Sequence, residues 1–247
     1  MNNNINLLHS APNNRVETVA SDLEGTLSAG AAWQGMRGYL INQGREQAYK
    51  RFFLRKMPRY LLFRLGLVSQ ESMKQDWILG LLQLFVGYTA EQMAELGQWV
   101  VENEIWPKRR QSVVDELLSH LDRGRRVIIN TGQFEPLLAE LLPKMEGVEG
   151  IGTPLILEDG RITGRLAGPL NTGVCKAEQL EPFARDGLIL SAYGDSEQDI
   201  PMLEMSHMPV AVHPDRGLKR EAENRGWPIL EDVNTSQRSS TEDETEP

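Results

Sequence analysis

Residues 19–28 read VASDLEGTLS, a short apolar run that passes at once into two carboxylates, Asp22 and Glu24, and then into a Gly-Thr turn. The run from Val16 to Ser21 has the apolar and β-branched composition of a buried strand. Charged groups are costly to bury unless they are paired. Two carboxylates at the end of a core strand therefore reduce stability, and their presence indicates a site with a chemical function.

Strand-like and helix-like segments alternate along much of the remaining chain, which predicts an α/β fold with a parallel sheet covered on both faces. The expected strands are 16–21, 126–130, 188–193 and 209–212. The spacing of apolar residues predicts helices over 111–123, stopping at Gly124, and near 136–142. In TPLILEDGRITG, residues 153–164, the pair Asp159-Gly160 lies between two apolar arms and predicts a small β-hairpin.

The interval 30–107 has a different character, because helical spacing runs through it without a convincing strand. Thr89 and Gln92 have the spacing of a capping box, and apolar residues between Trp77 and Phe85 line the helix before it. We therefore expect an inserted helical cap. The predicted division is a core of 15–29 and 108–233, a cap of 30–107, and disordered tails at 1–14 and 234–247.

The composition of the chain indicates which partners the protein could bind and which cellular compartment suits it. Lys+Arg 26 against Asp+Glu 35 gives a formal net charge of −9, which argues against a nucleic acid held through its phosphates. The single cysteine, Cys175, forms no internal disulfide and supports no zinc cluster, so a reducing compartment such as the cytoplasm is expected. The N-terminus lacks the pattern of a secretory signal, and the apolar window 77–86 is too short to cross a bilayer.

Polar residues follow the predicted strands, and the carboxyl ends of parallel strands meet at one edge of a sheet. The residues expected at this edge are Asp22, Glu24, Thr131, Gly132, Lys176, Asp195 and Asp199. Several carboxylates in one crevice repel one another unless a cation lies between them. Mg²⁺ takes a few oxygen ligands from a protein and completes its shell with water and substrate phosphate. The sequence therefore predicts a Mg²⁺ site.

This set of residues supports displacement at phosphorus by a carboxylate, giving an aspartyl-phosphate that water then cleaves. Asp22 is the expected nucleophile. Lys176 and Mg²⁺ would offset the charge on the phosphoryl oxygens, while the Thr131 hydroxyl and the N–H groups of the loop at Gly132 would hold them. Helix capping is the simpler explanation for Asp199, but it leaves the other residues unexplained.

Four motifs, DLEGT (22–26), INTG (129–132), Lys176 and GDSEQD (194–199), make residues 16–230 resemble the haloacid dehalogenase (HAD) superfamily, and its phosphoserine-phosphatase-like branch in particular. The resemblance implies a phosphoric monoester hydrolase with a Rossmann-like core and a helical cap between the first two motifs. It also implies that Asp22, Asp195 and the backbone carbonyl of Glu24 bind Mg²⁺, with Asp199 in support.

Glu24 departs from the pattern of most phosphatases in the family, which have aspartate as the general acid and base at this position. Glutamate reaches about 1.5 Å further, and a misplacement of ~1 Å can cost roughly 100-fold in rate. Enolase-phosphatases and a phosphoserine:homoserine phosphotransferase resemble this chain in carrying Asp-x-Glu-Gly. We therefore expect a working acid and base at Glu24. Phosphotransfer to an alcohol, or a catalytically weak binding module, are the alternatives.

The cap segment from Arg37 to Arg64 contains eight basic residues and one acid, Glu46, interleaved with apolar side chains. Such a segment is often a solvated helical face. It could also admit an anionic substrate or lie on an anionic membrane. The expected substrate is therefore a small or amphipathic phosphorylated molecule, and peripheral membrane contact through the cap is a further hypothesis. Nothing in the sequence predicts the oligomeric state.

Overall fold

The computed structural model describes residues 7–8 and 16–231. The expected tails lie outside these ranges except for Leu7 and Leu8. The carbonyl oxygen of Leu7 accepts a hydrogen bond from the Gly150 N–H at 3.1 Å, and both leucines pack against the core. These two residues are therefore attached to the edge of the sheet.

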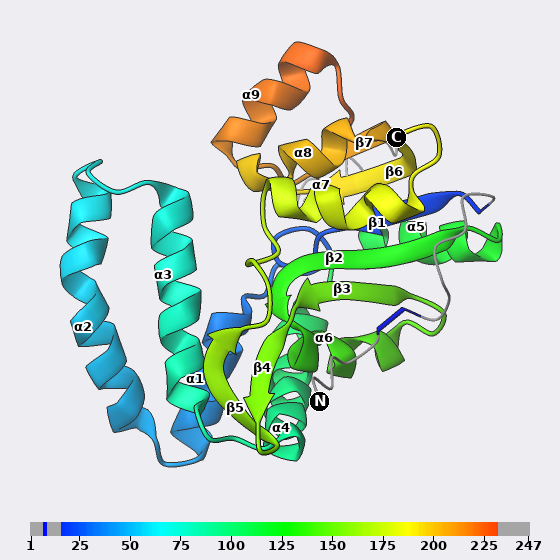
Figure 1. The fold of residues 1–247 in the computed structure, drawn as a ribbon. Coiled ribbons are helices and arrows are strands. Elements are labelled where there is room, and N and C mark those ends of the chain that lie inside the picture. The colour runs from blue at the N-terminus through cyan, green and yellow to red at the C-terminus, as the bar shows by residue number, and fades with distance from the viewer. Residues whose placement is uncertain (1–6, 9–15, 232–247) are drawn as a thin grey trace, which may run out of the picture.

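The described residues form a six-stranded parallel sheet in the order β3-β2-β1-β6-β7-β8, together with an antiparallel hairpin (Figure 1). The strands of the sheet are β1 (Thr18–Ser21), β2 (Arg126–Phe134), β3 (Glu149–Thr153), β6 (Ile189–Gly194), β7 (Ser206–Val212) and β8 (Ile229–Leu230). The hairpin joins β4 (Leu155–Glu158) to β5 (Arg161–Leu166). The predicted α/β class and the hairpin at Asp159-Gly160 are confirmed.

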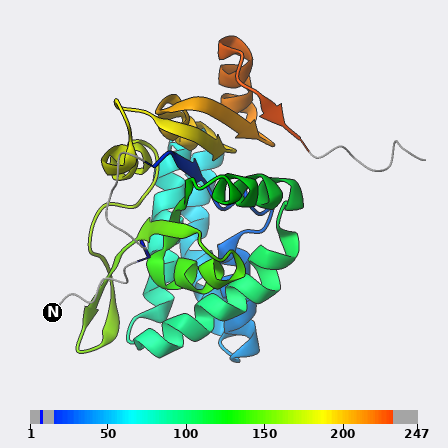
Figure 2. The ribbon, with the colours of Figure 1, turned by 90° about the vertical axis from the view of Figure 1, so that its right-hand side faces the viewer.

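Helices cover both faces of this sheet (Figures 1 and 2). They are α5 (Gln111–Asp122), α6 (Glu135–Leu141), α7 (Val174–Leu180), α8 (Ile200–Glu204) and α9 (Arg216–Arg225). Alternate residues of one strand point to opposite faces: Val19 packs in the cluster that contains α5, and Ala20 in the cluster that contains α7, α8 and α9. The α5 helix buries Val113, Val114 and Leu117, the face that its apolar spacing predicts.

Residues 32–108 are almost entirely helical. They contain α1 (Ala32–Asn42), α2 (Glu46–Arg64), α3 (Gln70–Leu82) and α4 (Ala90–Val100), with short helical turns at Gln83–Phe85, Val101–Ile105 and Trp106–Lys108. The capping box predicted at Thr89 and Gln92 is present at the start of α4. Helices α2 and α3 form a long antiparallel pair that projects away from the sheet (Figure 1). Among the described residues no helix combines the length and hydropathy needed to cross a bilayer.

The cap joins the core through two segments that lie side by side. The outgoing segment donates from the Ala29 N–H to the Lys108 carbonyl at 2.9 Å, and the returning segment donates from the Arg110 N–H to the Leu27 carbonyl at 2.8 Å. Ser28 is buried between them, and its hydroxyl donates to the Ile105 carbonyl at 2.7 Å. The entry and exit of the cap are therefore fixed to each other next to the end of β1.

Candidate active site

Asp22 is the first residue after β1, in the middle of the carboxyl edge of the sheet. In register, Ser21 lies between Ile129 of β2 and Tyr193 of β6. The Asp22 N–H donates to the Tyr193 carbonyl at 2.9 Å, and the Asp22 side chain is buried. The chain therefore continues the β1 ladder by one residue and presents the Asp22 carboxylate between β2 and the end of β6.

The buried ammonium of Lys176, on α7, lies between two carboxylates. Its Nζ donates to Asp22 Oδ1 and to Asp199 Oδ1, each at 2.6 Å. Burial would lower the pKa of Lys176, but the carboxylates of Asp199 and Asp22 outweigh it and raise that pKa above its usual range. Asp199 and Asp22 lie 23 and 154 positions from Lys176 in the sequence. The three side chains thus form one ionic group with Lys176 at its centre.

The two carboxylates differ in their surroundings. Burial raises the pKa of Asp22 to about 6, although the Lys176 ammonium opposes this, and the neighbouring Asp199 adds to it. Burial also disfavours the charged form of Asp199, but Lys176 and the donors of Ser196 hold its pKa below the usual range. One ammonium therefore does not stabilise both carboxylates equally, and the charged form of Asp22 is the less well stabilised of the two.

Asp199 also fixes the loop that carries Asp195. Its Oδ2 accepts from the N–H of Asp195 at 3.2 Å, the N–H of Ser196 at 3.1 Å and the Ser196 hydroxyl at 3.0 Å. The capping box at Ser196 is therefore real, yet Oδ1 of the same carboxylate binds Lys176. A Cβ at Gly194 would lie 2.4 Å from Asp199 Cβ, so this close approach requires glycine.

Asp22, Asp195 and Asp199 each offer a carboxylate oxygen within 4.8 Å of the others. Gly25 makes room for this cluster: its φ is +93°, and a Cβ there would lie 2.0 Å from Asp195 Oδ2. An all-oxygen, carboxylate-rich set fits a hard divalent cation such as Mg²⁺. Both oxygens of Asp199 already accept hydrogen bonds from the protein, which is compatible with the expectation that Asp22 and Asp195 bind the cation and Asp199 supports them.

Thr131 and Gly132 lie within β2, just past Ile129, the last β2 residue that pairs with β1. The Gln133 N–H donates to the Thr131 hydroxyl oxygen at 3.3 Å, and the buried Asn171 amide donates to the Thr131 carbonyl at 3.1 Å. The Gly132 carbonyl accepts from the Thr153 hydroxyl at 2.9 Å. Neighbouring segments therefore hold the backbone of the second motif in place.

Glu24 is held at both of its carboxylate oxygens. Oε1 accepts from the backbone N–H of Ala32, the first residue of α1, and Oε2 accepts from the side-chain amide of Gln133. Glu24 is half-buried and is thus tied to the cap on one side and to the second motif on the other. The predicted role of its backbone carbonyl stays a prediction.

Sequence reasoning missed Gln133 and Asn171. Gln133 directly follows the Thr131-Gly132 pair, which was the only signal available for it. Asn171 donates to Asn130 Oδ1 at 2.7 Å as well as to the Thr131 carbonyl, but it lies in a loop after the hairpin with no recognisable motif. Both residues position others and are visible only in three dimensions.

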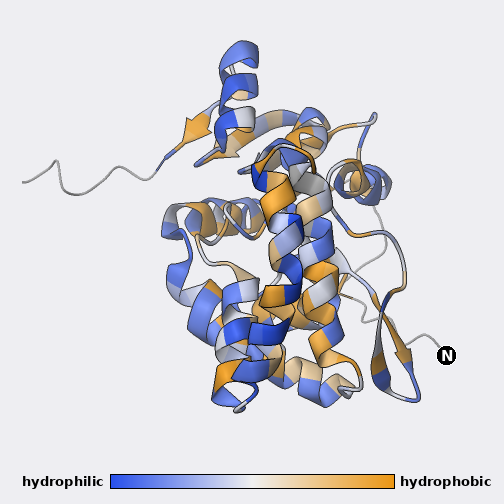
Figure 3. Cartoon of the chain, turned by 90° about the vertical axis from the view of Figure 1, so that its left-hand side faces the viewer, coloured by the Kyte–Doolittle hydropathy of each residue, from blue (hydrophilic) through white to orange (hydrophobic). Residues whose placement is uncertain are grey.

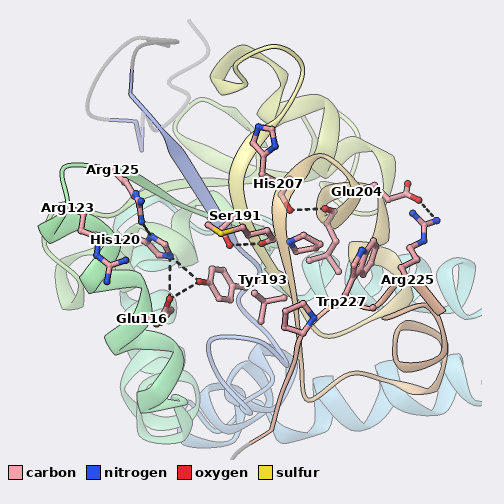
Figure 4. Close-up of a pocket in the computed structure, with 17 residues that line it drawn as sticks. Glu116, His120, Arg123, Arg125, Ser191, Tyr193, Glu204, His207, Arg225 and Trp227 are labelled. Atoms are coloured by element: carbon pink, nitrogen blue, oxygen red, sulfur yellow. Dashed lines mark hydrogen bonds and ion pairs between the residues drawn. The ribbon is translucent and has the colours of Figure 1, made fainter. Parts of the chain in front are cut away.

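A cavity of about 900 Å³ lies elsewhere, on the α5 side of β6 and β7 (Figure 4). His120 of α5 reaches across it to the Tyr193 hydroxyl at 3.1 Å, and Trp227 and Arg225 lie on the other side. Asp22, Thr131, Lys176 and Asp195 do not line this cavity. Its lining comes from α5 on one side and from residues 225–228 on the other, with β6 and β7 beneath.

Comparisons with known proteins agree with this fold. A family model described as haloacid dehalogenase-like hydrolase matches residues 19–204. A phosphoserine phosphatase of Mycobacterium tuberculosis is 32% identical over 152 residues, which are 60% of this chain and 49% of that protein. The chain spans about half the length of the curated relatives it matches.

Solved structures share the fold. A protein with unknown function from Bordetella pertussis Tohama I has a TM-score of 0.71 at 25% identity, over 87% of this chain and 98% of that one. A phosphoserine phosphatase captured as a phospho-aspartyl intermediate analogue has a TM-score of 0.59 at 18% identity, over 90% and 96% of the two chains. The likeness in fold therefore covers most of this chain in both cases.

Proposed function

The chain belongs to the haloacid dehalogenase-like hydrolases, and from this premise we propose that it is a Mg²⁺-dependent phosphatase of the phosphoserine-phosphatase-like kind. It cleaves a phosphomonoester through an aspartyl-phosphate on Asp22. The observation that carries the proposal is the buried Lys176 ammonium, 2.6 Å from both Asp22 and Asp199, at the carboxyl edge of the sheet. The curated relatives named as phosphatases support the same reaction class.

In the first step an Asp22 carboxylate oxygen attacks phosphorus, and the bond from phosphorus to the alcohol oxygen of the substrate breaks. Glu24 gives its proton to the departing alkoxide, which leaves as an alcohol. Lys176 holds Asp22 in place through its Oδ1 hydrogen bond and supplies positive charge next to the phosphoryl oxygens. The Thr131 hydroxyl and the loop at Gly132 orient those oxygens.

In the second step water attacks the phosphorus of the aspartyl-phosphate, and the bond from phosphorus to the Asp22 oxygen breaks. Glu24, now a carboxylate, accepts the proton of this water, which returns both residues to their starting states. Asp22 and Asp195 are the residues that would hold Mg²⁺, with Asp199 in support. When bound, Mg²⁺ supplies a positive charge that offsets the negative charge of the phosphoryl oxygens.

The substrate that we propose is a small or amphipathic phosphorylated molecule that reaches the site beneath the cap. Relatives named phosphoserine phosphatase and histidinol-phosphatase act on small phosphomonoesters, which supports this size class. Phosphotransfer to an alcohol uses the same aspartyl-phosphate, with the alcohol oxygen replacing water as the attacking group. Adding acceptor alcohols and measuring their phosphorylation separates transfer from hydrolysis.

The test is turnover of p-nitrophenyl phosphate with Mg²⁺, and its loss with EDTA. Asp22→Asn removes the nucleophile, so turnover should fall on the order of 10³-fold or more. Asp159→Asn in the hairpin turn is the matched control, because asparagine also tolerates the positive φ of that position. Turnover retained in Asp22→Asn, or lost equally in Asp159→Asn, would remove Asp22 from the proposed role.

A further inference from the structure

The second half of α2, from its middle, and the turn that follows it expose several large apolar side chains. Seven large side chains there are open to solvent, and we name them together the cap tip: Phe53, Leu54, Tyr60, Leu61, Leu62, Leu65 and Leu67. Leu54, Leu65 and Leu67 are 68%, 72% and 71% exposed. A single exposed leucine needs no explanation, but a contiguous group of apolar residues marks an interaction surface.

The exposed leucines lie along one side of α2. Leu54, Leu61 and Leu65 are at positions i, i+7 and i+11, which fall on the same face of an α-helix. The α2 residues that are buried are Tyr49 and Phe52, which pack elsewhere. Figure 3 views the molecule from the side of α2 and shows hydrophobic and hydrophilic segments alternating along the projecting helices. The apolar face of α2 is therefore turned outward.

Basic side chains border this apolar face. Arg51, Arg55 and Arg64 are exposed, and in the described part of the chain no ion pair is seen for Arg55 or Arg64. By contrast, Lys56 pairs with Asp76 at 2.8 Å and Arg59 donates to the Ser72 hydroxyl at 2.7 Å, which attaches α2 to α3. The cap tip thus combines protruding leucines with exposed arginines, Arg55 and Arg64, which lie outside the described ion pairs between α2 and α3.

The distribution of charge favours one kind of binding partner for the cap tip over another. The segment 37–64 contains eight basic residues and one acid, whereas the whole chain has a net charge of −9. An acidic protein that approaches an anionic surface is oriented by its basic patch. A symmetric dimer through the cap tip would instead place arginines of like charge against each other.

We propose that the cap tip is a docking surface for an anionic lipid bilayer. The leucines enter the boundary between headgroups and acyl chains, and Arg55 and Arg64 lie at the level of the anionic headgroups, with their stems along the apolar layer. The helix lies on the membrane and does not cross it, in line with the length and hydropathy of the described helices.

The test is co-sedimentation of the full chain with vesicles of phosphatidylcholine alone or mixed with phosphatidylglycerol, at low and high salt. Binding is expected for the phosphatidylglycerol vesicles and should weaken as salt rises. Leu54→Ser/Leu61→Ser/Leu65→Ser should lower the partition coefficient roughly tenfold for each leucine that enters the layer. Arg55→Glu/Arg64→Glu should lower it about tenfold or more.

The matched control is Ile41→Ser/Met208→Ser, which changes exposed apolar residues outside the cap tip and should bind as the parent does. Circular dichroism and turnover check that each variant folds. Four outcomes overturn the proposal: no binding to phosphatidylglycerol vesicles, equal binding to phosphatidylcholine alone, equal loss in the control, or a dimer in solution that the leucine variant abolishes. Because vesicle binding requires no turnover, its failure is distinguishable from failure of the proposed reaction.

Discussion

At the scale of single residues, Glu24 is one methylene longer than aspartate, and hydrogen-bond donors from two different segments bind its carboxylate. The Ala32 N–H belongs to the first residue of the cap, and the Gln133 amide belongs to the strand that carries Thr131. A longer side chain can be a defect in a site built for aspartate. Here two donors lie where the longer carboxylate reaches them, so the local structure accommodates glutamate, and we propose that the site is adapted to it.

This geometry predicts that Glu24→Asp is slower than the parent, by about 10- to 100-fold in kcat. Shortening the side chain by about 1.5 Å takes its carboxylate out of reach of at least one donor. Steady-state kinetics with p-nitrophenyl phosphate measure this, and KM should change less than kcat. A gain in rate would contradict the adaptation and support a site weakened by its natural residue.

Gln133 is expected to act only through Glu24. Gln133→Ala should lower kcat about tenfold, with little change in KM or in melting temperature, because the variant still has an intact core. In a double-mutant cycle with Glu24→Ala, adding Gln133→Ala should cost almost nothing further. Full additivity in that cycle would mean that the two side chains work independently.

At the scale of secondary-structure elements, His120 of α5 joins the helix to β6. Arg125 donates to His120 Nδ1 at 2.8 Å, so the ring proton is on Nε2, which faces the Tyr193 hydroxyl at 3.1 Å. The Tyr193 hydroxyl donates to Glu116 Oε1 at 3.3 Å. Burial lowers the pKa of His120, and the Arg125 guanidinium lowers it further. The network therefore needs a neutral imidazole.

This network predicts a loss of stability in mild acid. The unfolded histidine takes up a proton near pH 6.5, whereas the folded one, with its lowered pKa, resists it. The free energy of unfolding should therefore be unaffected above this pH and should decrease as the pH falls below it. His120→Gln keeps an uncharged acceptor and donor, so the part of this pH dependence that comes from His120 should disappear. The free energy of unfolding is measured by urea titration at pH 7.5 and at pH 5.5. An equal change between these two pH values in parent and variant would refute the assignment.

The elements that the sequence predicted best are those with one dominant local signal. The central strands β1 and β6 were found because they are short apolar runs, and α4 because Thr89 and Gln92 form a capping box. The edge strand β3 was missed because its sequence, EGIGT, contains two glycines and one apolar β-branched residue. Strand β8 was missed because two residues give no periodicity.

The site was predictable to the same extent. The positions of Asp22 and Asp195 follow from strand order, since parallel strands bring their carboxyl ends together, whereas Lys176 lies on α7 after the hairpin and was placed by its motif. The partners of Glu24 do not follow from it. Gln133 reaches Glu24 across 109 positions of sequence, and α1 contributes only a backbone N–H, which has no signature in the amino-acid sequence.

At the scale of the whole molecule, the position of the cap depends on its junction with the core. Gly30 lies against the carbonyl oxygen of Glu104, where an added Cβ would approach to 2.3 Å. The Gly30 N–H donates to the Ser28 hydroxyl at 2.9 Å, and the Ala31 N–H donates to Glu104 Oε1 at 3.2 Å. These contacts lie between Glu24 and the start of α1, so the junction positions both the cap and Glu24, the proposed acid and base.

Gly30→Ala should therefore separate the two segments of the junction and disturb Glu24 at a distance. The clash is with backbone, which cannot turn aside as a side chain could, so we expect a loss of about 1–3 kcal/mol in the free energy of unfolding and a fall in kcat of roughly tenfold or more. Gly38→Ala is the matched control. Gly38 is inside α1, where a Cβ would make an ordinary contact 3.5 Å from Trp99 Nε1, so alanine there should stabilise the helix by up to ~1 kcal/mol. Urea unfolding and turnover measured on both variants decide the matter, because a cap that moves independently of the junction would leave kcat of Gly30→Ala equal to that of Gly38→Ala.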